Sequence, residues 1–282
     1  MSLTSQISIL MVLYEENMSI LSRTLDQLKE FKIIIIDNSG NKKLKDEILS
    51  KYQIHEYCLN KKNLGVSGGY NQALNLCDTE YVFMKNADCF IDKENLLILK
   101  RYLEDNQDCG VVSPTFYDEN GKLSFNGGKL PENETSAEIL NLAGNTCVEK
   151  VLGTGFFAKT EDIKRIGMYD ENLFIFFCDD DLCRKVKKLN KHIVQMFDAK
   201  CIHSHGISKV KNRFKRIFLR EHYFILDQLN YYKKLKNYKP YNKLRSKLLN
   251  YFVKTFINLF LLNFDKSLKF YSRIYAFIKF SR

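Results

Sequence analysis

Residues Lys32–Asp37 read KIIIID, a run of four isoleucines closed by an aspartate. Because apolar and polar residues do not alternate in this run, it predicts a strand that is covered on both faces. Further strands are predicted at Gln6–Leu13 and Tyr81–Lys85, and segments with helical spacing follow at Asn17–Phe31 and Ser67–Cys77. This alternation predicts an α/β fold with a mainly parallel sheet, in which ligands bind at the carboxyl ends of the strands.

The pattern continues to about residue 208 and then changes. The other expected strands are Ile54–Asn60, Gly110–Phe116, Val151–Lys159 and Ile193–Phe197, and the other expected helices are Lys93–Asn106, Thr160–Ile166 (capped by Thr160) and Asp180–Leu189. Residues 117–150 are polar and rich in turn formers, which predicts a loop or a small hairpin insertion. We therefore expect one domain over 1–208 and a helical extension over 209–282, with a break near Pro240.

The positive charge of the chain is concentrated in this extension. The formal net charge is +11, yet Lys209–Arg282 holds 19 Lys/Arg and three acids, while the preceding residues hold 25 basic and 30 acidic ones. Basic helices rich in Tyr and Phe suit an anionic membrane surface. The alternative is a helical cap that packs on the first domain or on a second subunit of a homo-oligomer. No recognised nucleic-acid motif accompanies the charge, so we expect no nucleic-acid partner.

The eight cysteines predict reduced thiols, because they show no CxxC spacing and no secretory segment follows Met1. We therefore expect a cytoplasmic protein, peripheral on the inner face of the cytoplasmic membrane if the extension binds lipid. The longest apolar stretch, Tyr251–Phe264, is interrupted by Lys254 and Asn258. It is also shorter than the roughly 18–20 residues that a membrane-spanning helix needs.

Two stretches place acidic side chains directly after an apolar run. They are YVFMKNADCFID at 81–92 and FIFFCDDDLC at 174–183. Carboxylates beside so much apolar surface are costly unless they meet a metal, a proton or a cationic partner. Asn86 and Asp88 follow the first run, and one carboxylate with a polar neighbour binds Mg²⁺ or Mn²⁺ when a diphosphate supplies the remaining oxygens. The alternative is a cap at the end of a strand.

The second run leads into Asp179, Asp180 and Asp181, at the start of an expected helix. Acids favour a helix N-terminus, but three in succession exceed what capping requires, and like charges raise one another's pKa. One of the three would therefore be a general base that removes a proton from an acceptor hydroxyl. Helix capping alone is the alternative.

Two turns and a pair of histidines offer further ligand contacts. Asp37 would accept the imide N–H of a uracil or thymine base, or would only satisfy the backbone of its own turn. The stretch NLGVSGGYN, Asn63–Asn71, places glycines at the start of a helix, where exposed N–H groups suit a phosphate or a sugar hydroxyl; a simple turn is the alternative. His203 and His205 would bind a metal or a phosphate, or would be structural.

Taken in order, these stretches resemble the family 2 glycosyltransferases of bacteria, especially the rhamnosyltransferase-like branch, from about Ile7 to Ser208. The matching motifs are a turn at Tyr14–Asn17, IDNSG around Asp37, the complete N-x-G-x-x-G-G-x-N at Asn63–Asn71, an N-x-D form of the DxD motif at Asn86 and Asp88, G-x-x-F at Gly153–Phe156, a form of F-x-E-D-x-D-L around Asp179, and H-x-x-G-x-S at His203–Ser208. The motifs are specific as an ordered set.

The resemblance implies a GT-A fold, with a mixed sheet flanked by helices, a nucleotide-sugar donor, a divalent metal (Mn²⁺ or Mg²⁺) and inversion at the anomeric carbon. It assigns nucleotide binding to Tyr14, Asp37, Asn63, Gly65, Asn71 and Asn86, metal binding to Asp88 and His203, and the role of catalytic base to Asp179. The family has Glu where this chain has Cys178, so Asp180 and Asp181 remain alternatives for the base. A nucleotide-binding half would occupy about 1–116 and an acceptor half about 117–208.

Together these features predict an enzyme that moves rhamnose or another hexose from a uridine- or thymidine-diphosphate sugar to a hydroxyl of a growing bacterial surface glycan or lipid-linked oligosaccharide. The alternative, motivated by Cys178 and the reduced DxD motif, is an inactive nucleotide-sugar-binding or membrane-associated scaffold protein. A sugar-phosphate nucleotidyltransferase would need a glycine-rich basic turn after the first strand, whereas residues 14–17 read YEEN.

Overall fold

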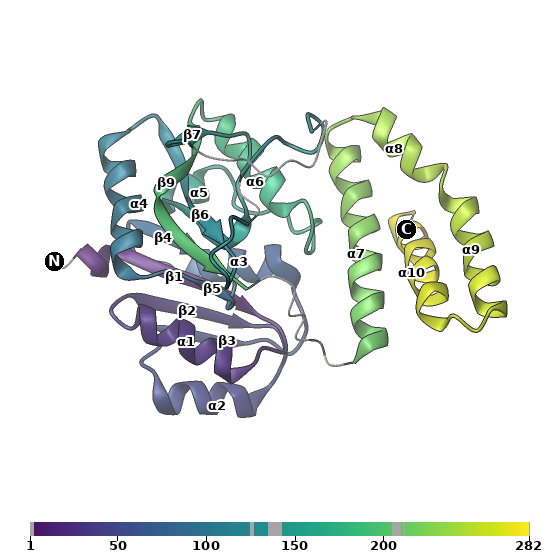
Figure 1. Ribbon diagram of the computed structural model, residues 1–282, viewed down its shortest axis with the longest axis horizontal. Helices are drawn as coiled ribbons and strands as arrows, with labels where there is room; N and C mark the ends of the chain where they lie inside the picture. Colours follow the sequence, from purple (N-terminus) through teal and green to yellow (C-terminus); the bar gives the residue numbers. More distant parts are fainter. Residues whose placement is uncertain (1–2, 125–126, 135–142, 205–209, 211, 282) are drawn as a thin grey trace. The chain divides into compact units, whose positions relative to one another are not determined.

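The structure is a computed structural model that describes residues 3–124, 127–134, 143–204, 210 and 212–281 (Figure 1). It divides into two compact units. The first comprises Met1–Asp170 and Asp179–Ile207, and the second comprises Glu171–Cys178 and Ser208–Arg282. The main boundary therefore falls next to the expected one at 208, but the short segment 171–178, which we expected in the first unit, belongs to the second.

A mixed sheet forms the centre of the first unit (Figure 1). Its strands are β1 (Ile7–Leu13), β2 (Lys32–Asp37), β3 (Glu56–Leu59), β4 (Tyr81–Met84), β5 (Cys89–Phe90), β6 (Cys109–Tyr117), β7 (Thr146–Cys147), β8 (Phe156–Lys159) and β9 (His192–His203), in the order β3-β2-β1-β4-β8-β6-β9-β5, with β7 paired to β9. The strands from β3 to β4 are parallel, as expected. Strand β8 is antiparallel to both of its neighbours, so the sheet is mixed rather than mainly parallel.

Helices cover both faces of this sheet, which explains why the four consecutive isoleucines of strand β2 are all buried. The helices of the first unit are α1 (Met18–Leu28), α2 (Lys42–Lys51), α3 (Gly65–Leu76), α4 (Lys93–Asp105), α5 (Thr160–Arg165) and α6, which begins at Cys178 in the second unit and ends at Lys187. Ile33 and Ile35 share one core cluster with α1, α2 and α4. On the other face, a Cβ atom at Gly69 of α3 would lie 2.6 Å from Val12 Cγ1, so this glycine allows α3 to pack closely against β1.

Several expected elements differ from the structure. Helix α2 was not predicted, because its ten residues KKLKDEILSK bury only Leu44 and Ile48. Residues 151–155 are not part of a strand; Gly153–Gly155 form a 3₁₀ turn before β8. Thr160 is the first residue of α5 rather than its cap, which is Lys159. The apolar run Phe174–Phe177 forms a series of bends.

The second unit contains four helices in its described part: α7 (Arg213–Lys234), α8 (Tyr238–Arg245), α9 (Leu248–Phe260) and α10 (Phe264–Phe280) (Figure 1). Helix α10 packs against α7 and α9 around a small core that includes Ile225, Leu229 and Ile274. Pro240 lies in the first turn of α8, where the missing N–H costs little. The interruption between α7 and α8 therefore comes before Pro240. Within the described residues, no helix combines the length and the apolar character needed to cross a bilayer.

Candidate functional site

Asp88 and His203 meet at one corner of the sheet, although they are distant in sequence. Cys89 of β5 pairs with His203 at the end of β9, and the Ser204 amide donates to the Asp88 carbonyl over 3.0 Å. His203 Nε2 lies 3.5 Å from Asp88 Oδ1, and the two side chains are only 10% and 17% exposed. The structure therefore brings together the two residues that we expected to bind metal.

A carboxylate is a suitable ligand for Mg²⁺ or Mn²⁺, so Asp88 fits the implied cation. Across the described part of the chain, no group of three or more His, Cys, Asp and Glu side chains could hold a metal ion. The rest of the expected histidine motif, including His205, lies outside the described residues.

The turn Gly153–Gly155 connects this corner with the acidic triplet. Thr154 Oγ1 accepts a hydrogen bond from the Asn86 amide over 3.1 Å, and the Thr154 carbonyl accepts one from Cys89 Sγ over 3.0 Å. On its other side, a Cβ atom at Gly153 would lie within 2.6 Å of both Asp179 carboxylate oxygens. Asp179 and the segment Asn86–Cys89, which contains Asp88, therefore meet at one turn.

The three aspartates of the triplet have different surroundings. Asp181 is buried, with Lys185 Nζ 3.6 Å from its Oδ2. Asp180 pairs with Lys150 over 3.1 Å, and burial raises the pKa of Asp180 although the Lys150 ammonium opposes this shift. Asp179 is half-buried and is the member that borders the Gly153 turn. Asp179 is therefore the member of the triplet that lies against the turn, and its role as the base stays a prediction.

The remaining expected ligand residues lie along the carboxyl ends of β1 and β2. Tyr14 follows β1, whose last carbonyl accepts the Asn38 amide over 2.9 Å. The Asn38 side chain donates to the Gly65 carbonyl over 3.0 Å, and Asn63 Oδ1 accepts the Gly65 amide over 2.8 Å. Gly65 has φ +74°, a conformation that favours glycine, and it begins helix α3. The first turn of α3 is therefore adjacent to the β2 turn.

Asp37 is fully buried and both of its oxygens accept hydrogen bonds. Oδ1 accepts the Ser39 amide and Oδ2 accepts the Tyr57 hydroxyl, each over 2.8 Å. Burial raises the pKa of Tyr57, and the Asp37 charge raises it further, so the phenol keeps its proton and remains a donor. The turn role of Asp37 is present in the structure, and its contact with a base stays a prediction.

The side chain of Asn71 forms hydrogen bonds within the protein. Its side-chain amide donates to the Tyr169 carbonyl over 3.1 Å, and its Oδ1 accepts the Tyr169 amide over 2.9 Å. The ring of its neighbour Tyr70 stacks on Tyr169, with centroids 5.4 Å apart. Asn71 therefore ties helix α3 to the segment at Tyr169, and its expected contact with a nucleotide stays a prediction.

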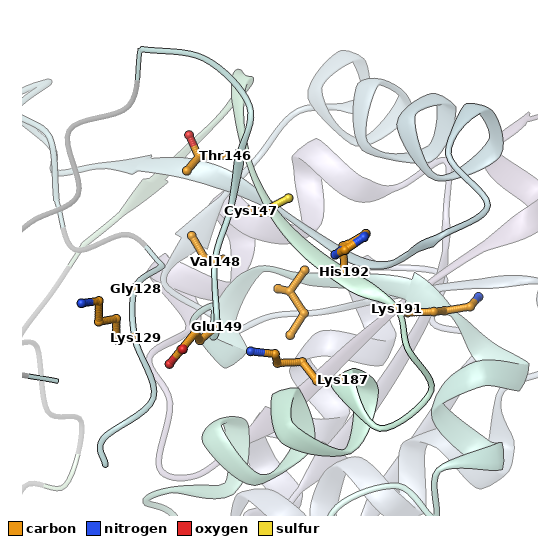
Figure 2. A pocket seen from close by; sticks show the side chains of 10 residues that line it. Gly128, Lys129, Thr146, Cys147, Val148, Glu149, Lys187, Lys191 and His192 are labelled. Atoms are coloured by element: carbon orange, nitrogen blue, oxygen red, sulfur yellow. The ribbon is translucent and has the colours of Figure 1, made fainter. Parts of the chain in front are cut away.

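A hollow of about 420 Å³ lies beside β7 and the start of β9. Figure 2 shows the side chains that line it. Lys187 extends toward Glu149, while Lys191 points away and pairs with Asp162 over 2.5 Å. His192, which also lines the hollow, is the first residue of β9, and His203 is the last. The hollow therefore lies at the opposite end of this strand from the corner with Asp88.

Comparisons with known proteins agree with the resemblance. The family model described as glycosyl transferase family 2 matches residues 8–157, more than half of the chain. The chain is a family 2 glycosyltransferase. It is 24% identical over 216 residues to the dTDP-rhamnosyl transferase RfbF of Shigella flexneri, which covers 74% of this chain and 72% of that protein. It is likewise 24% identical over 223 residues to the low-salt glycan biosynthesis hexosyltransferase Agl10 of Haloferax volcanii. This match covers 74% of this chain and 71% of that protein.

Solved structures show that this glycosyltransferase has the expected GT-A fold. GalNAc-T7, crystallised with UDP, GalNAc and Mn²⁺, aligns with a TM-score of 0.58 and 14% identity, over 80% of this chain and 50% of that one. The mannosyltransferase PcManGT from Pyrobaculum calidifontis, solved with GDP-Man and Mn²⁺, aligns with a TM-score of 0.54 and 13% identity, over 78% and 62%. This chain thus spans about half of GalNAc-T7, and the likeness shows the fold alone.

Lys85 and Thr24 of this glycosyltransferase lie beside the site but were not predicted from the sequence. Thr24 Oγ1 donates to the Ala87 carbonyl over 2.6 Å and so fixes the turn that carries Asp88. Lys85 is fully buried, its Nζ lies 3.4 Å from Thr24 Oγ1, and burial lowers the pKa of the lysine. The available signal for Lys85 was a charged residue directly after the apolar run YVFM.

Asp227 of α7 was also missed. Its carboxylate, completely buried, accepts the amides of Phe174, Ile175 and Phe176 over 3.0, 2.9 and 2.9 Å. Burial raises the pKa of Asp227 to about 6, although the three amide N–H groups oppose this shift. Phe174 also stacks on Tyr223 with centroids 3.9 Å apart. Helix α7 therefore holds the segment that leads directly into the acidic triplet.

Replacing Asn71 with alanine is expected to lower the free energy of unfolding by about 2–4 kcal/mol, because the buried amide and carbonyl of Tyr169 would lose their partners. Urea denaturation followed by circular dichroism measures this change. Asn75→Ala, one turn later on α3 at an exposed position, is the control and should change the free energy by less than about 0.5 kcal/mol. An Asn71→Ala protein that is as stable as wild type but binds nucleotide poorly would contradict the structural role.

Asp227→Asn is expected to destabilise the second unit by about 2–4 kcal/mol, because an amide NH₂ would replace one oxygen that faces backbone N–H donors. The midpoint of urea denaturation measures the loss. Asp265→Asn is the matched control, since Asp265 forms a partly exposed ion pair with Arg213 that is worth at most about 1 kcal/mol. Equal effects of the two substitutions would show that the three amide contacts contribute no more than this ion pair.

Proposed function

We propose that this family 2 glycosyltransferase moves rhamnose or another hexose, with inversion, from a uridine- or thymidine-diphosphate sugar to a hydroxyl of a bacterial surface glycan or lipid-linked oligosaccharide. The observation that carries the proposal is that two segments meet at the turn Gly153–Gly155: Asn86–Cys89, which contains Asp88, and Asp179. The relative RfbF, named as a dTDP-rhamnosyl transferase, supports thymidine-diphosphate rhamnose as the first donor to test.

In the proposed reaction the Asp179 carboxylate accepts the proton of the acceptor hydroxyl. The hydroxyl oxygen forms a bond to the anomeric carbon while the bond from that carbon to the diphosphate oxygen breaks on the opposite side. A single displacement of this kind inverts the configuration and needs no second carboxylate as nucleophile. Asp88 and His203 would hold the divalent cation, whose charge stabilises the departing diphosphate.

The donor nucleotide is proposed to bind in the half formed by about 1–116, along the carboxyl ends of β1, β2 and β4. Tyr14, Asp37, Asn63 and Gly65 line the first part of this edge, and Asn86, whose side chain is exposed, follows β4. The start of α3 offers backbone N–H groups to a phosphate or a sugar hydroxyl. The acceptor is proposed to bind to residues of about 117–208, on the side of Asp179.

The second unit is proposed to bring the enzyme to the inner face of the cytoplasmic membrane, where a lipid-linked acceptor would be found. Support comes from the charge of residues 209–282, a net +16. Basic amphipathic helices bind anionic lipid surfaces through such charges.

A second candidate function is an inactive nucleotide-sugar-binding protein, and Cys178 favours it because the family carries Glu there. In the structure the Cys178 thiol is buried and donates to the Ile175 carbonyl over 3.1 Å. Binding of a nucleotide-sugar without transfer or hydrolysis, in the presence of Mn²⁺ and candidate acceptors, would identify this second function.

Asp179→Asn is expected to lower kcat by at least about a hundredfold and to leave the donor Kd nearly unchanged, because the amide cannot accept the hydroxyl proton. The donor is the nucleotide-sugar of a panel that stabilises the protein most against heat in Mn²⁺. Asp180→Asn, whose carboxylate is paired with Lys150, should retain far more activity. Full activity of Asp179→Asn would move the base to Asp180 or Asp181.

Asp88→Ala is expected to raise the donor Kd in Mn²⁺ by about tenfold or more, because the cation would lose its protein carboxylate. Calorimetric titration with and without EDTA measures the Mn²⁺-dependent part of the affinity, which this substitution should remove. Asp105→Ala, at an exposed position on α4, is the control and should bind donor as wild type does. An affinity that EDTA lowers equally in wild type and Asp88→Ala would place the cation elsewhere.

A further inference from the structure

Helix α9, all of whose residues are described, presents most of its apolar side chains to solvent. Only Tyr251 is buried in this helix of 13 residues, although its sequence LLNYFVKTFINLF is largely apolar. Leu248, Tyr251 and Thr255 recur at three- and four-residue spacing, so they form the stripe that packs on the rest of the unit. The helix therefore buries one narrow side and leaves a broad apolar side uncovered.

Phe252, Phe256 and Phe260 are spaced by four residues and form one row along this exposed side. Their side chains are 42%, 67% and 87% exposed. The apolar surface continues beyond the helix, where Leu262 and Phe264 are 73% and 55% exposed. Contiguous exposed apolar surface of this kind marks a site of contact with another molecule or with a membrane.

Positive charges flank this surface in the sequence. Lys243, Arg245 and Lys247 precede α9, Lys254 lies within it and Lys266 follows it, and all five are exposed. The sequence from 243 to 269 contains one acid, Asp265, and this carboxylate pairs with Arg213. The partner that covers the phenylalanine row must therefore offer apolar contact with negative charge beside it.

A second copy of this chain fits these requirements poorly, because it would bring two segments of net charge +16 together. The surface of an anionic bilayer fits both, since negative headgroups lie directly above the acyl chains. A helix of 13 residues is about 20 Å long, too short to cross the hydrocarbon core but suited to lie in the plane of the interface.

We infer that helix α9 and the turn after it enter the interface of an anionic bilayer, with Phe252, Phe256 and Phe260 among the acyl chains and the flanking lysines at the headgroups. This inference deepens the membrane association proposed above and rests on that part of the proposal alone. Its test contains neither donor nor acceptor, so its failure leaves the transferase assays unaffected.

The chain contains no tryptophan, so a single introduced tryptophan reports on its own position. Phe256→Trp is expected to emit at shorter wavelength when phosphatidylcholine vesicles containing phosphatidylglycerol are added, and brominated acyl chains should quench it. Phe197→Trp, at a 41% exposed phenylalanine of β9, is the control and should show neither change. Emission of Phe256→Trp that does not respond to these vesicles would overturn the inference.

The double variant Phe256→Ser/Phe260→Ser is expected to bind these vesicles at least about tenfold more weakly in flotation assays, while Phe197→Ser binds as wild type does. Weak binding to vesicles of pure phosphatidylcholine would support the role of charge. Undiminished binding of the double variant would contradict insertion of the row. A wild-type dimer in light scattering that the double substitution converts to a monomer would instead make this surface an interface between two copies.

Discussion

The geometry of the site depends on the absence of a side chain at Gly153. A Cβ atom at this position would overlap the Asp179 carboxylate, so any other residue would displace either the acid or the turn. The same turn holds the opposite part of the site through Thr154, which contacts the Asn86 amide and the Cys89 thiol. One close approach therefore sets the distance between the residue proposed to bind the cation and the residue proposed to take the proton.

The mixed character of the sheet explains how this turn reaches its place. Strand β8 is antiparallel to β4, and its first residue, Phe156, pairs with Met84 at the end of β4. An antiparallel strand begins where its neighbour ends, so the three residues before β8 lie beside the three that follow β4. Had β8 been parallel, as the alternation of strands and helices suggested, Gly153 would lie at the other edge of the sheet, far from Asp88.

The sequence was sufficient where a local pattern determines the structure. Strand β2 has the predicted bounds, because four isoleucines in succession fit only a strand covered on both faces. The GT-A fold and the family also followed from ordered motifs. The direction of β8 and the use of Asn71 by Tyr169 depend on contacts between residues far apart in the chain, and a single sequence does not reveal such contacts. The exposure of α9 also could not be predicted, because an apolar sequence normally indicates a buried helix and only the positions of its neighbours show otherwise.

Asp227 gives the C-terminal helices a role that membrane binding alone does not explain. Helix α6 begins with Cys178 in the second unit and continues with Asp179 in the first, so the proposed base directly follows a segment that α7 holds by three amide contacts. A carboxylate removed from water is costly unless its hydrogen bonds offset the loss, and the raised pKa of Asp227 shows that burial outweighs them here. The buried Asp227 carboxylate is thus the group that orients the backbone N–H groups of residues 174–176. Helix α7 therefore holds the backbone of residues 174–176, from which the chain continues into the first turn of α6.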